Sequence, residues 1–467
     1  MSSAKPPLLE NATRDLAAFA ARLCFEDIPR DAIEHMKYCV LDSIGCCLFG
    51  VTLPWTRHVQ DMVQAEGGAQ AASIFGGGGK TSVSQAVLVN STAGHAFELD
   101  DIHKESIIHP GSLATPVALA FAEEAGGTSG REVLTALIAG YEVGARVGNA
   151  ATMSLFLRGF HPQGTSGAFV AAATAGRMLN LGPLQMQHAL GIVGSQAGGL
   201  MAAQEGAMVK RFHSGRAAQS GVYSALLARR GFTGITDVLE APYGGFLSSL
   251  SDTPNAQRLT AGLGTIWETL NVGYKPHASV TSIHTALDAL ADIMREHRLD
   301  ADAIAGVDAG LSHMTYVHCA WEYAAQGVTA AQMNLYYGLA VIALDGMAFV
   351  DQYREERLRD PRILDFIKRI TARVDPQIEA MGAAFRHAAR VRVTTKAGQT
   401  FTREILHRRG SPENPLKPGD VEYKFRNVVR SCLSKPHMER VMTLTRALDT
   451  LDSTAELSAI LAAAPGA

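Results

Sequence analysis

The segment from His95 to Ser112 is the densest cluster of titratable side chains in the sequence. Its three histidines and four carboxylates are His95, His103 and His109, together with Glu98, Asp100, Asp101 and Glu105. Asp and His would suit a divalent metal ion, but no HxxxH pair occurs in the segment. A solvated loop whose Asp and Ser residues cap helices is a second interpretation, because adjacent aspartates are costly unless wet or paired. We adopt a third interpretation, an active-site loop that holds no metal.

Three further stretches carry cations that would suit a small anionic substrate. His161 stands just before Gly164–Gly167, where a helix is predicted to begin, and the free N–H groups of a helix start attract carboxylates. The seven residues Lys210–Arg216 hold four basic side chains, which form either a carboxylate clamp or a solvated face. Lys275 lies near an expected domain boundary, where the alternatives are a cleft residue and a surface cation.

The motifs of other reaction classes are missing from the sequence. Gly76–Thr81 looks like a phosphate-binding loop, but that motif needs a glycine where Ile74 stands. There is no redox motif and no nucleophile elbow. Several His and Lys side chains with a carboxylate or two suit proton abstraction beside a carboxylate of a small polyanion, because cations stabilise the charge that develops. These residues indicate a lyase or an epimerase.

The elements that must position these residues are mainly helices. Apolar residues recur at three and four positions from about Asp31 to Arg230. The helices expected there are Asp31–Gly50, Ser112–Ala125, Arg131–Val147, Thr165–Leu179, Leu184–Gly198 and Gly215–Arg230. Alternation over Ala389–Ile405, with a turn at Lys396–Gly398, predicts a β-hairpin, and helical sequence returns after it.

This distribution predicts a mainly α fold with two domains. The expected large all-helical domain comprises residues 8–271 plus 419–464, and residues 272–418 form a smaller α+β lid domain inserted into it. If the C-terminal helices rejoin the first domain, two connections cross between the domains. The cleft between them is then the expected ligand site.

Composition limits the partners. The chain has 42 Lys and Arg against 45 Asp and Glu, a net charge of −3 over 467 residues, so neither nucleic acid nor a membrane surface is an expected partner. With 47% hydrophobic and 19% charged residues, global disorder is excluded. Met1–Asn11 lacks the features of a signal peptide and no run suits a membrane helix, so we expect a cytoplasmic protein. The six cysteines form no CxxC pair and are expected to be reduced thiols.

With these segments in view, the sequence resembles the MmgE/PrpD family over nearly its whole length. The motifs that carry the resemblance are His95–Pro110 with Ala114–Ala120, His213–Ala218 running on to Gly231–Gly234, Tyr274–Pro276 with His284, and Asn414–Leu416 before Lys424–Arg426. The family includes 2-methylcitrate dehydratases, cis-aconitate decarboxylases and iminodisuccinate epimerases. The resemblance implies a helical domain with an α+β lid, a homodimer, and catalysis without a metal or organic cofactor.

The resemblance also implies roles for single residues. His161 matches a family histidine and is expected to donate or accept the proton. Lys210 and Lys275 match two lysines that bind substrate carboxylates. Tyr337 matches a hydrogen-bonding tyrosine of the lid, and His109 is expected to orient a partner or to move a proton.

The remaining candidates come from the same comparison of motifs. The acidic position of the family falls at Glu98, and Asp101 follows in the same loop, so that one of the two is expected to anchor a catalytic histidine or lysine. His103, His213 and Arg216 are expected to bind the substrate.

The first loop departs from the pattern of the family. Its dehydratases read Asp-aromatic-Asn-Asp-Thr and its decarboxylases Asp-Phe-Asp-Asp-Thr where this chain has Glu98–Ile102. Replacing a threonine by Ile102 removes a hydroxyl that could bind a substrate oxygen, which changes specificity. We therefore expect a lyase, of dehydratase or decarboxylase type, that acts on a small di- or tricarboxylate through a carboxylate-stabilised carbanion. The alternatives are an epimerase of a small dicarboxylate and a non-catalytic carboxylate-binding protein.

Overall fold

The computed structural model describes residues 9–463. Residues 8 and 464, which end the predicted helical domain, lie outside the described residues, as does most of the N-terminal stretch that bears on a signal peptide. Helices dominate the described chain, and its longer strands are gathered in one sheet. The predicted mainly α class is confirmed.

The first part of the chain is a body of helices. They are α1 (Ala12–Arg22), α2 (Arg30–Gly50), α3 (Pro54–Glu66), α4 (Val83–Gly94), α5 (Pro110–Glu124), α6 (Gly130–Leu157), α7 (Ser166–Met178), α8 (Pro183–Gly194), α9 (Val209–Arg229) and α10 (Phe246–Leu250). Small residues let these helices approach closely, since a Cβ atom added to Gly140 of α6 would lie 2.0 Å from the Thr174 hydroxyl oxygen of α7. Within residues 9–463, no single helix has the length and apolar character needed to cross a membrane; the α2–α3 pair, bent by 81°, meets that test by length and composition alone.

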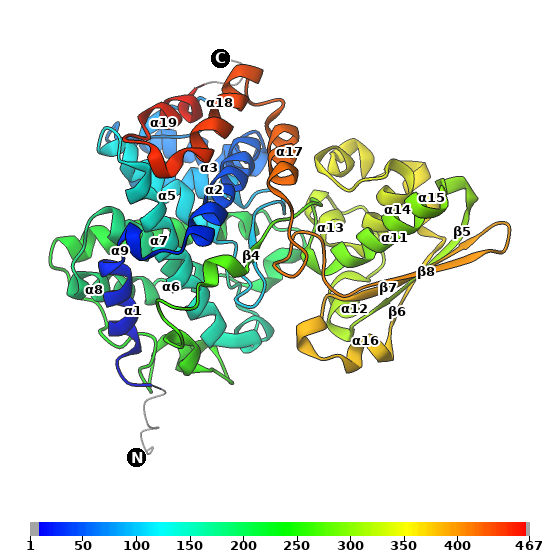
Figure 1. The fold of residues 1–467 in the computed structure, drawn as a ribbon, viewed down its shortest axis with the longest axis horizontal. Coiled ribbons are helices and arrows are strands. Elements are labelled where there is room, and N and C mark those ends of the chain that lie inside the picture. The colour runs from blue at the N-terminus through cyan, green and yellow to red at the C-terminus, as the bar shows by residue number, and fades with distance from the viewer. Residues whose placement is uncertain (1–8, 464–467) are drawn as a thin grey trace.

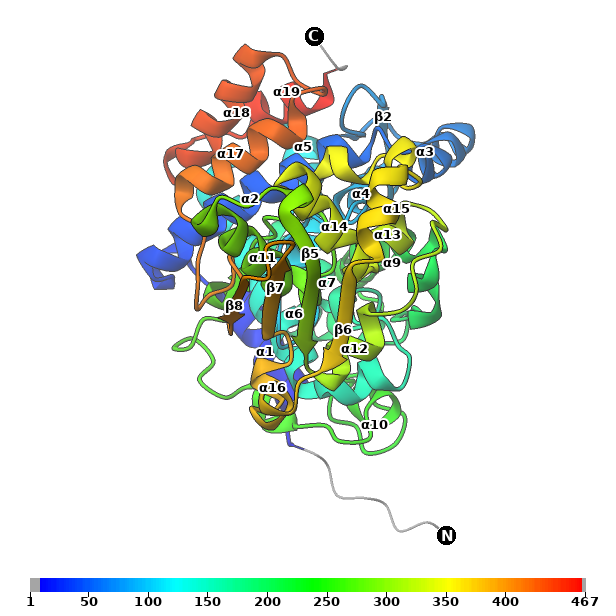
Figure 2. The ribbon, with the colours of Figure 1, turned by 90° about the vertical axis from the view of Figure 1, so that its right-hand side faces the viewer.

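The strands lie mainly between residues 272 and 418. They are β5 (Ile304–Leu311), β6 (Ile370–Val374), β7 (Ala389–Thr395) and β8 (Thr400–Ile405), which form a sheet in the order β6-β5-β7-β8 (Figure 2). β7 and β8 are the predicted hairpin, with Val393 opposite Phe401. β5 runs antiparallel to β7 and parallel to β6. The helices of this region are α11 (His284–His297), α12 (His313–Cys319), α13 (Val328–Met333), α14 (Leu335–Asp345), α15 (Pro361–Ile367) and α16 (Pro376–Ala380).

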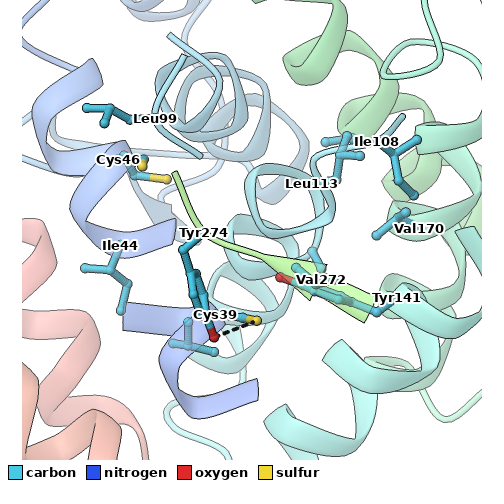
Figure 3. Close-up of a cluster of buried hydrophobic side chains, with 14 of the residues drawn as sticks. Cys39, Ile44, Cys46, Leu99, Ile108, Leu113, Tyr141, Val170, Val272 and Tyr274 are labelled. Atoms are coloured by element: carbon cyan, nitrogen blue, oxygen red, sulfur yellow. Dashed lines mark hydrogen bonds between the residues drawn. The ribbon is translucent and has the colours of Figure 1, made fainter. Parts of the chain in front are cut away.

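Short strand pairs tie the loops together. β1 (Ala72–Ser73) pairs with β2 (Lys80–Thr81), and β3 (Ile102–His103) pairs antiparallel with β4 (Val272–Gly273). The second pair joins the middle of the histidine-rich loop between α4 and α5 to the start of the strand-bearing region. Tyr274 follows β4 and its hydroxyl lies 3.5 Å from the Cys39 sulfur of α2 (Figure 3). This buried contact fixes the backbone immediately before Lys275. All six cysteines are free.

The C-terminal helices return to the first body. α17 (Pro418–Val429) and α18 (Lys435–Arg446) pack against α2, and α19 (Ala455–Ala462) packs against α5 (Figure 1). Lys424 of α17 reaches into the body, where its Nζ lies 2.6 Å from Asp42 Oδ1 and donates to the Leu99 carbonyl at 2.5 Å. We propose that residues 8–271 plus 419–464 form one domain and residues 272–418 a second; this packing supports the division.

One predicted helix begins earlier than expected. The basic stretch Lys210–Arg216 was predicted to precede its helix, but it lies inside the first turns of α9, which starts at Val209. Residues of a helix are spaced roughly 100° apart, so Lys210 and Arg216 point to different sides of it. Lys210 and Arg211 are therefore buried, while Arg216 is exposed.

Candidate active site

A cavity of about 90 Å³ lies between the helical body and the strand-bearing region. Five of the predicted site residues line it, and they come from four distant segments of the chain: Glu98, His109, His161, Lys210 and Lys275. The loop between α4 and α5 supplies the first two, α9 supplies Lys210, and the segment after β4 supplies Lys275. The structure thus brings cations and histidines from distant segments to one hollow.

Glu98 is the centre of charge in this cavity. Its Oε1 accepts hydrogen bonds from Lys210 Nζ and, at 2.7 Å, from Arg211 Nη1, and its Oε2 accepts one from Lys275 Nζ at 3.1 Å. Burial would raise the pKa of the Glu98 carboxyl, but the charges of Lys210, Lys275 and Arg211 hold this pKa well below its usual value. The carboxylate fixes the positions of all three cations.

The three cations outnumber the one carboxylate that they share. Burial lowers the pKa of Lys210, and the Glu98 charge opposes that shift. Arg211 also donates to the His95 carbonyl at 3.3 Å and, through Nη2, to Gln332 Oε1 at 3.3 Å. The group retains positive charge that a substrate carboxylate would neutralise.

A second group on the same loop is built on histidines. Asp100 is buried, with its Oδ2 2.8 Å from His95 Nδ1 and its Oδ1 3.3 Å from His109 Nδ1. His109 Nδ1 also lies 2.7 Å from the Asp101 carbonyl oxygen. Burial lowers the pKa of His95 to about 4 against the raising effect of Asp100, so His95 is a neutral imidazole near pH 7. Its Nε2 is buried at the cavity without a hydrogen-bond partner among the described residues.

His161 continues this row of rings. Its centroid lies 5.9 Å from that of His95, and its Nδ1 lies 2.9 Å from Nδ1 of His213. One ring must donate its N–H to the lone pair of the other, so this contact sets their tautomers. Burial, with smaller effects from His95 and Lys210, lowers the pKa of His161 well below its usual value. The ring is therefore neutral near pH 7 in the free enzyme, and it can give a proton only after a bound anion raises its pKa.

Asp101 lies behind the cavity rather than in its lining. Its Oδ1 accepts a hydrogen bond from the Gly111 N–H at 2.9 Å at the start of α5, and its Oδ2 accepts one from the Tyr141 hydroxyl at 2.8 Å. Burial, reinforced by the charge of Asp42, raises the pKa of Asp101 to about 8. This side chain therefore holds the loop against α5 and α6.

Four other predicted site residues do not line the cavity, and one of them, His213, reaches it only through its contact with His161. Tyr337 is buried on α14 and its hydroxyl donates to the Gln352 carbonyl at 2.6 Å. His103 Nε2 lies 3.0 Å from Glu268 Oε2 and its Nδ1 contacts Ser106. Arg216 is exposed and donates to Gln219 at 2.7 Å.

The cavity also contains residues that the sequence reasoning did not assign to it. Lys104, Arg386 and His318 line the cavity. Arg211 does not line it but bonds to Glu98, and its place beside Lys210 in the basic stretch was a usable signal. Arg386 and His318 come from the strand-bearing region and had no pattern that could identify them, because their positions depend on the packing of that region onto the body.

One group of possible metal ligands occurs among the described residues. Ligand atoms of His95, Asp100 and His109 lie within 4.8 Å of one another. The hydrogen bond that Asp100 accepts from His95 and its 3.3 Å contact with His109 already account for the arrangement of the two rings. His103, which belongs to the metal site considered above, points to Glu268 instead.

The arrangement favours chemistry on a small polyanion. Lysines and an arginine can bind carboxylates and stabilise negative charge as it develops, and neutral imidazoles can move protons. Both functions meet in one space lined by buried charged groups, where water weakens electrostatic interactions less than at the protein surface.

The comparisons with known proteins agree with this chemistry. The MmgE/PrpD N-terminal domain matches residues 14–259 and the MmgE/PrpD C-terminal domain matches residues 277–450. A cis-aconitate decarboxylase of Aspergillus terreus is 32% identical over 470 residues, covering 96% of this chain and 95% of the relative. The cis-aconitate decarboxylase-like protein oryM of Aspergillus oryzae is 30% identical, with 97% of each chain covered. The cis-aconitate decarboxylase of Homo sapiens is 25% identical over 97% of this chain and 95% of its own.

This chain belongs to the MmgE/PrpD family. It is an enzyme of the lyase type, and the non-catalytic alternative is set aside.

Proposed function

We propose that the enzyme is a decarboxylase of a small tricarboxylate such as cis-aconitate. The observation that carries the proposal is the convergence of Lys210, Lys275 and His161 on one cavity. The names of the relatives, all cis-aconitate decarboxylases or like them, support it. Loss of carbon dioxide needs cations that hold the remaining carboxylates and a group that returns a proton to carbon.

The steps follow from the positions of the side chains. Lys210 and Lys275 bind a carboxylate that is conjugated with the reacting carbon. The C–C bond to a second carboxylate breaks, carbon dioxide leaves, and the electron pair moves into the conjugated carboxylate as an aci-carboxylate. His161 or His109 then gives a proton to the carbanionic carbon. A bound polyanion favours the protonated imidazole, because an opposite charge raises the pKa of a histidine.

Dehydration of a hydroxytricarboxylate needs the same cations but the opposite proton transfer. An imidazole takes the proton from carbon, the C–O bond breaks, and the hydroxyl group leaves as water with a proton from a second protonated imidazole, so dehydration remains part of the proposal. Epimerisation is a second candidate function, because two imidazoles, His109 and His161, line the cavity and could serve opposite faces of a substrate carbon.

Incubation of the enzyme with cis-aconitate and with citrate in deuterated water distinguishes these reactions. Release of carbon dioxide with one deuteron in the product supports decarboxylation, and loss of water supports dehydration. Exchange of a C–H hydrogen in a chiral dicarboxylate without a new product would instead indicate epimerisation. No turnover of any acid in a broad panel of di- and tricarboxylates would contradict the proposed function.

We also propose that the reaction needs no metal ion and that the enzyme is a homodimer, as the family resemblance implies. EDTA should leave the rate unchanged, and an inhibition that added metal reverses would instead assign an ion to His95, Asp100 and His109. Light scattering coupled to size exclusion measures the mass of the assembly.

A further inference from the structure

A second, larger groove lies against the catalytic cavity and shares part of its wall. The groove has a volume of about 600 Å³ and shares Phe156, Gln204, Met314, His318 and Met333 with the cavity. A hydrogen bond of 2.8 Å joins His318 Nε2 and Gln204 Oε1 in the shared wall. The two spaces are therefore separated only by side chains, two of which are flexible methionines.

The groove differs from the cavity in its chemistry. Leu157, Val317 and Trp321 line the groove but not the cavity, whereas Glu98, Lys210 and Lys275 line the cavity but not the groove. At the mouth, Leu157 is 73% exposed and Val317 is 62% exposed. Six of the ten residues that line the groove are apolar and the other four are Gln204, His313, His318 and Gln326, so no lysine or arginine of the described chain faces it. An apolar group would be removed from water by this surface.

A kink in α6 builds one wall of the groove. Thr152 has a φ of 60° inside the helix, and its hydroxyl donates to the Thr253 carbonyl at 3.1 Å. A β-branched residue adopts this conformation only at a cost, so the contact with Thr253 holds it in place. The turn after the kink presents Phe156 to the His318 ring, with the two centroids 5.7 Å apart at 85°. The chain thus accepts local strain where it brings an aromatic side chain to the shared wall.

We propose that the substrate carries an apolar substituent, an alkyl chain or a ring, which leaves the cavity past His318 and lies in this groove. The inference rests on the proposed function, because it places the carboxylate end of the same molecule on Lys210 and Lys275. The substrate class is then a tricarboxylate with a hydrophobic tail, of which cis-aconitate is the unsubstituted parent. A large, mainly apolar groove beside a small cationic cavity is what such a molecule requires.

Binding of two saturated, unreactive acids tests the inference. The probes are tricarballylate and tricarballylate carrying a hexyl chain, and calorimetry gives the Kd of each. Burial of one methylene is worth up to about fourfold in affinity, so the hexyl chain should lower the Kd by at least about tenfold. Equal Kd values would overturn the inference and leave the proposed function standing. Failure of both acids to bind would overturn both.

Substitutions at the exposed rim of the groove test whether the apolar substituent lies there. Val317→Asn and Leu157→Asn should remove most of the gain from the hexyl chain and leave the Kd of tricarballylate unchanged, because neither residue lines the cavity. Leu184→Asn is the matched control, since Leu184 is 63% exposed on α8 and does not line the groove. An unchanged gain in both mouth variants would overturn the inference. A mouth variant that changes the mass of the assembly but keeps the affinity gain from the hexyl chain would also overturn the inference. The groove would then be a contact between two copies of the chain.

Discussion

Glu98 and Asp101 lie three residues apart in one loop, and both carboxyl groups are buried, with 3% and 1% of the residue exposed. Their protonation nevertheless differs. The pKa of Glu98 is held well below its usual value, whereas burial and the charge of Asp42 raise the pKa of Asp101 to about 8. Burial alone therefore does not determine the charge of a carboxyl group; its neighbours do.

The neighbours also separate the roles of the two residues. Three cations surround Glu98 at the cavity, so it organises the groups that would hold a substrate. A phenol and a backbone amide surround Asp101, so it fastens the loop to two helices. A family motif rich in carboxylates can thus combine an electrostatic function and a structural one within a single turn.

The largest expected effect is that of Glu98→Gln. It leaves Lys210, Arg211 and Lys275 buried without their common counterion, which should lower the free energy of unfolding by about 3–5 kcal/mol. The rate should fall about 10³-fold as the lysines lose their positions. Denaturant unfolding and steady-state kinetics measure the two effects. Glu142→Gln is the control, since Glu142 is buried but bonds to Thr269 away from the cavity. If the rate fell equally in Glu98→Gln and Glu142→Gln, the catalytic positions of the cations would not depend on Glu98.

Lys210→Met should have the next largest effect. Glu98 keeps Arg211 and Lys275, so the protein should fold with a loss of about 1–3 kcal/mol, while the rate falls about 10²-fold because one carboxylate ligand is gone. Circular dichroism and kcat/KM at several substrate concentrations give both values. Lys80→Met, which removes an exposed lysine paired with Glu123, should leave the rate unchanged. A wild-type rate for Lys210→Met would remove this residue from the mechanism.

Ile102→Thr extends the comparison to the residue after Asp101. Ile102 lines the cavity, and its side chain cannot form a hydrogen bond to a substrate oxygen. A threonine hydroxyl at this position should favour the more polar of two substrates. The ratio of kcat/KM for cis-aconitate to kcat/KM for an acid with a less polar group should rise about tenfold. Competition between two acids in one assay measures the ratio. Ile102→Val keeps the apolar surface and should not change it; the same shift in both variants would assign the effect to size.

The smallest effect on catalysis is expected for Asp101→Asn, which should change the rate less than threefold or so, because an amide can replace the protonated carboxyl. Its effect on stability depends on pH. Since folding raises this pKa from 3.8 to about 8, the stability from Asp101 is full below about pH 4 and is lost as the pH rises through 8. From pH 5 to 8 the free energy of unfolding of the wild type should therefore fall, relative to that of Asp101→Asn, by up to about 1.4 kcal/mol per pH unit. Denaturant unfolding at several pH values measures this difference.

Glu98 supplies the contrasting control for that experiment. Its pKa is lowered in the folded state, so its contribution is present above its ordinary pKa and is lost only as the pH falls below it. Between pH 5 and 8 the stability difference between wild type and Glu98→Gln should thus be constant. If this stability difference changed with pH for Glu98→Gln, or did not change with pH for Asp101→Asn, the assignment of the two carboxyl groups would be wrong.

The parts of the fold that sequence predicts are those with local signals. Periodicity marks the helices of the body, and alternation with a turn marks the β7–β8 hairpin. The sheet around that hairpin has no such signal, since β5 contains Gly306 and Gly310 and pairs with a short parallel strand distant in the chain. Likewise α9 begins before its basic stretch, where no strong capping residue marks the start.

The site could be predicted only in part for a similar reason. Motifs identify the segments of His161, Lys210 and Lys275, but rotation of a helix about its axis decides which side chains face the cavity. Tyr337 is an instance: α14 turns its hydroxyl toward Gln352. His318 shows the converse, because only the packing of α12 onto the body brings it to the cavity wall.

The bond from Lys424 to the Leu99 carbonyl spans 325 residues of sequence. During synthesis the loop between α4 and α5 leaves the ribosome long before α17, so the loop emerges before the lysine that supports it exists. A chain that stops before Lys424 should therefore leave this loop without its support, however well the earlier helices have formed. A protease cut in α17 would likewise act on the loop from a distance.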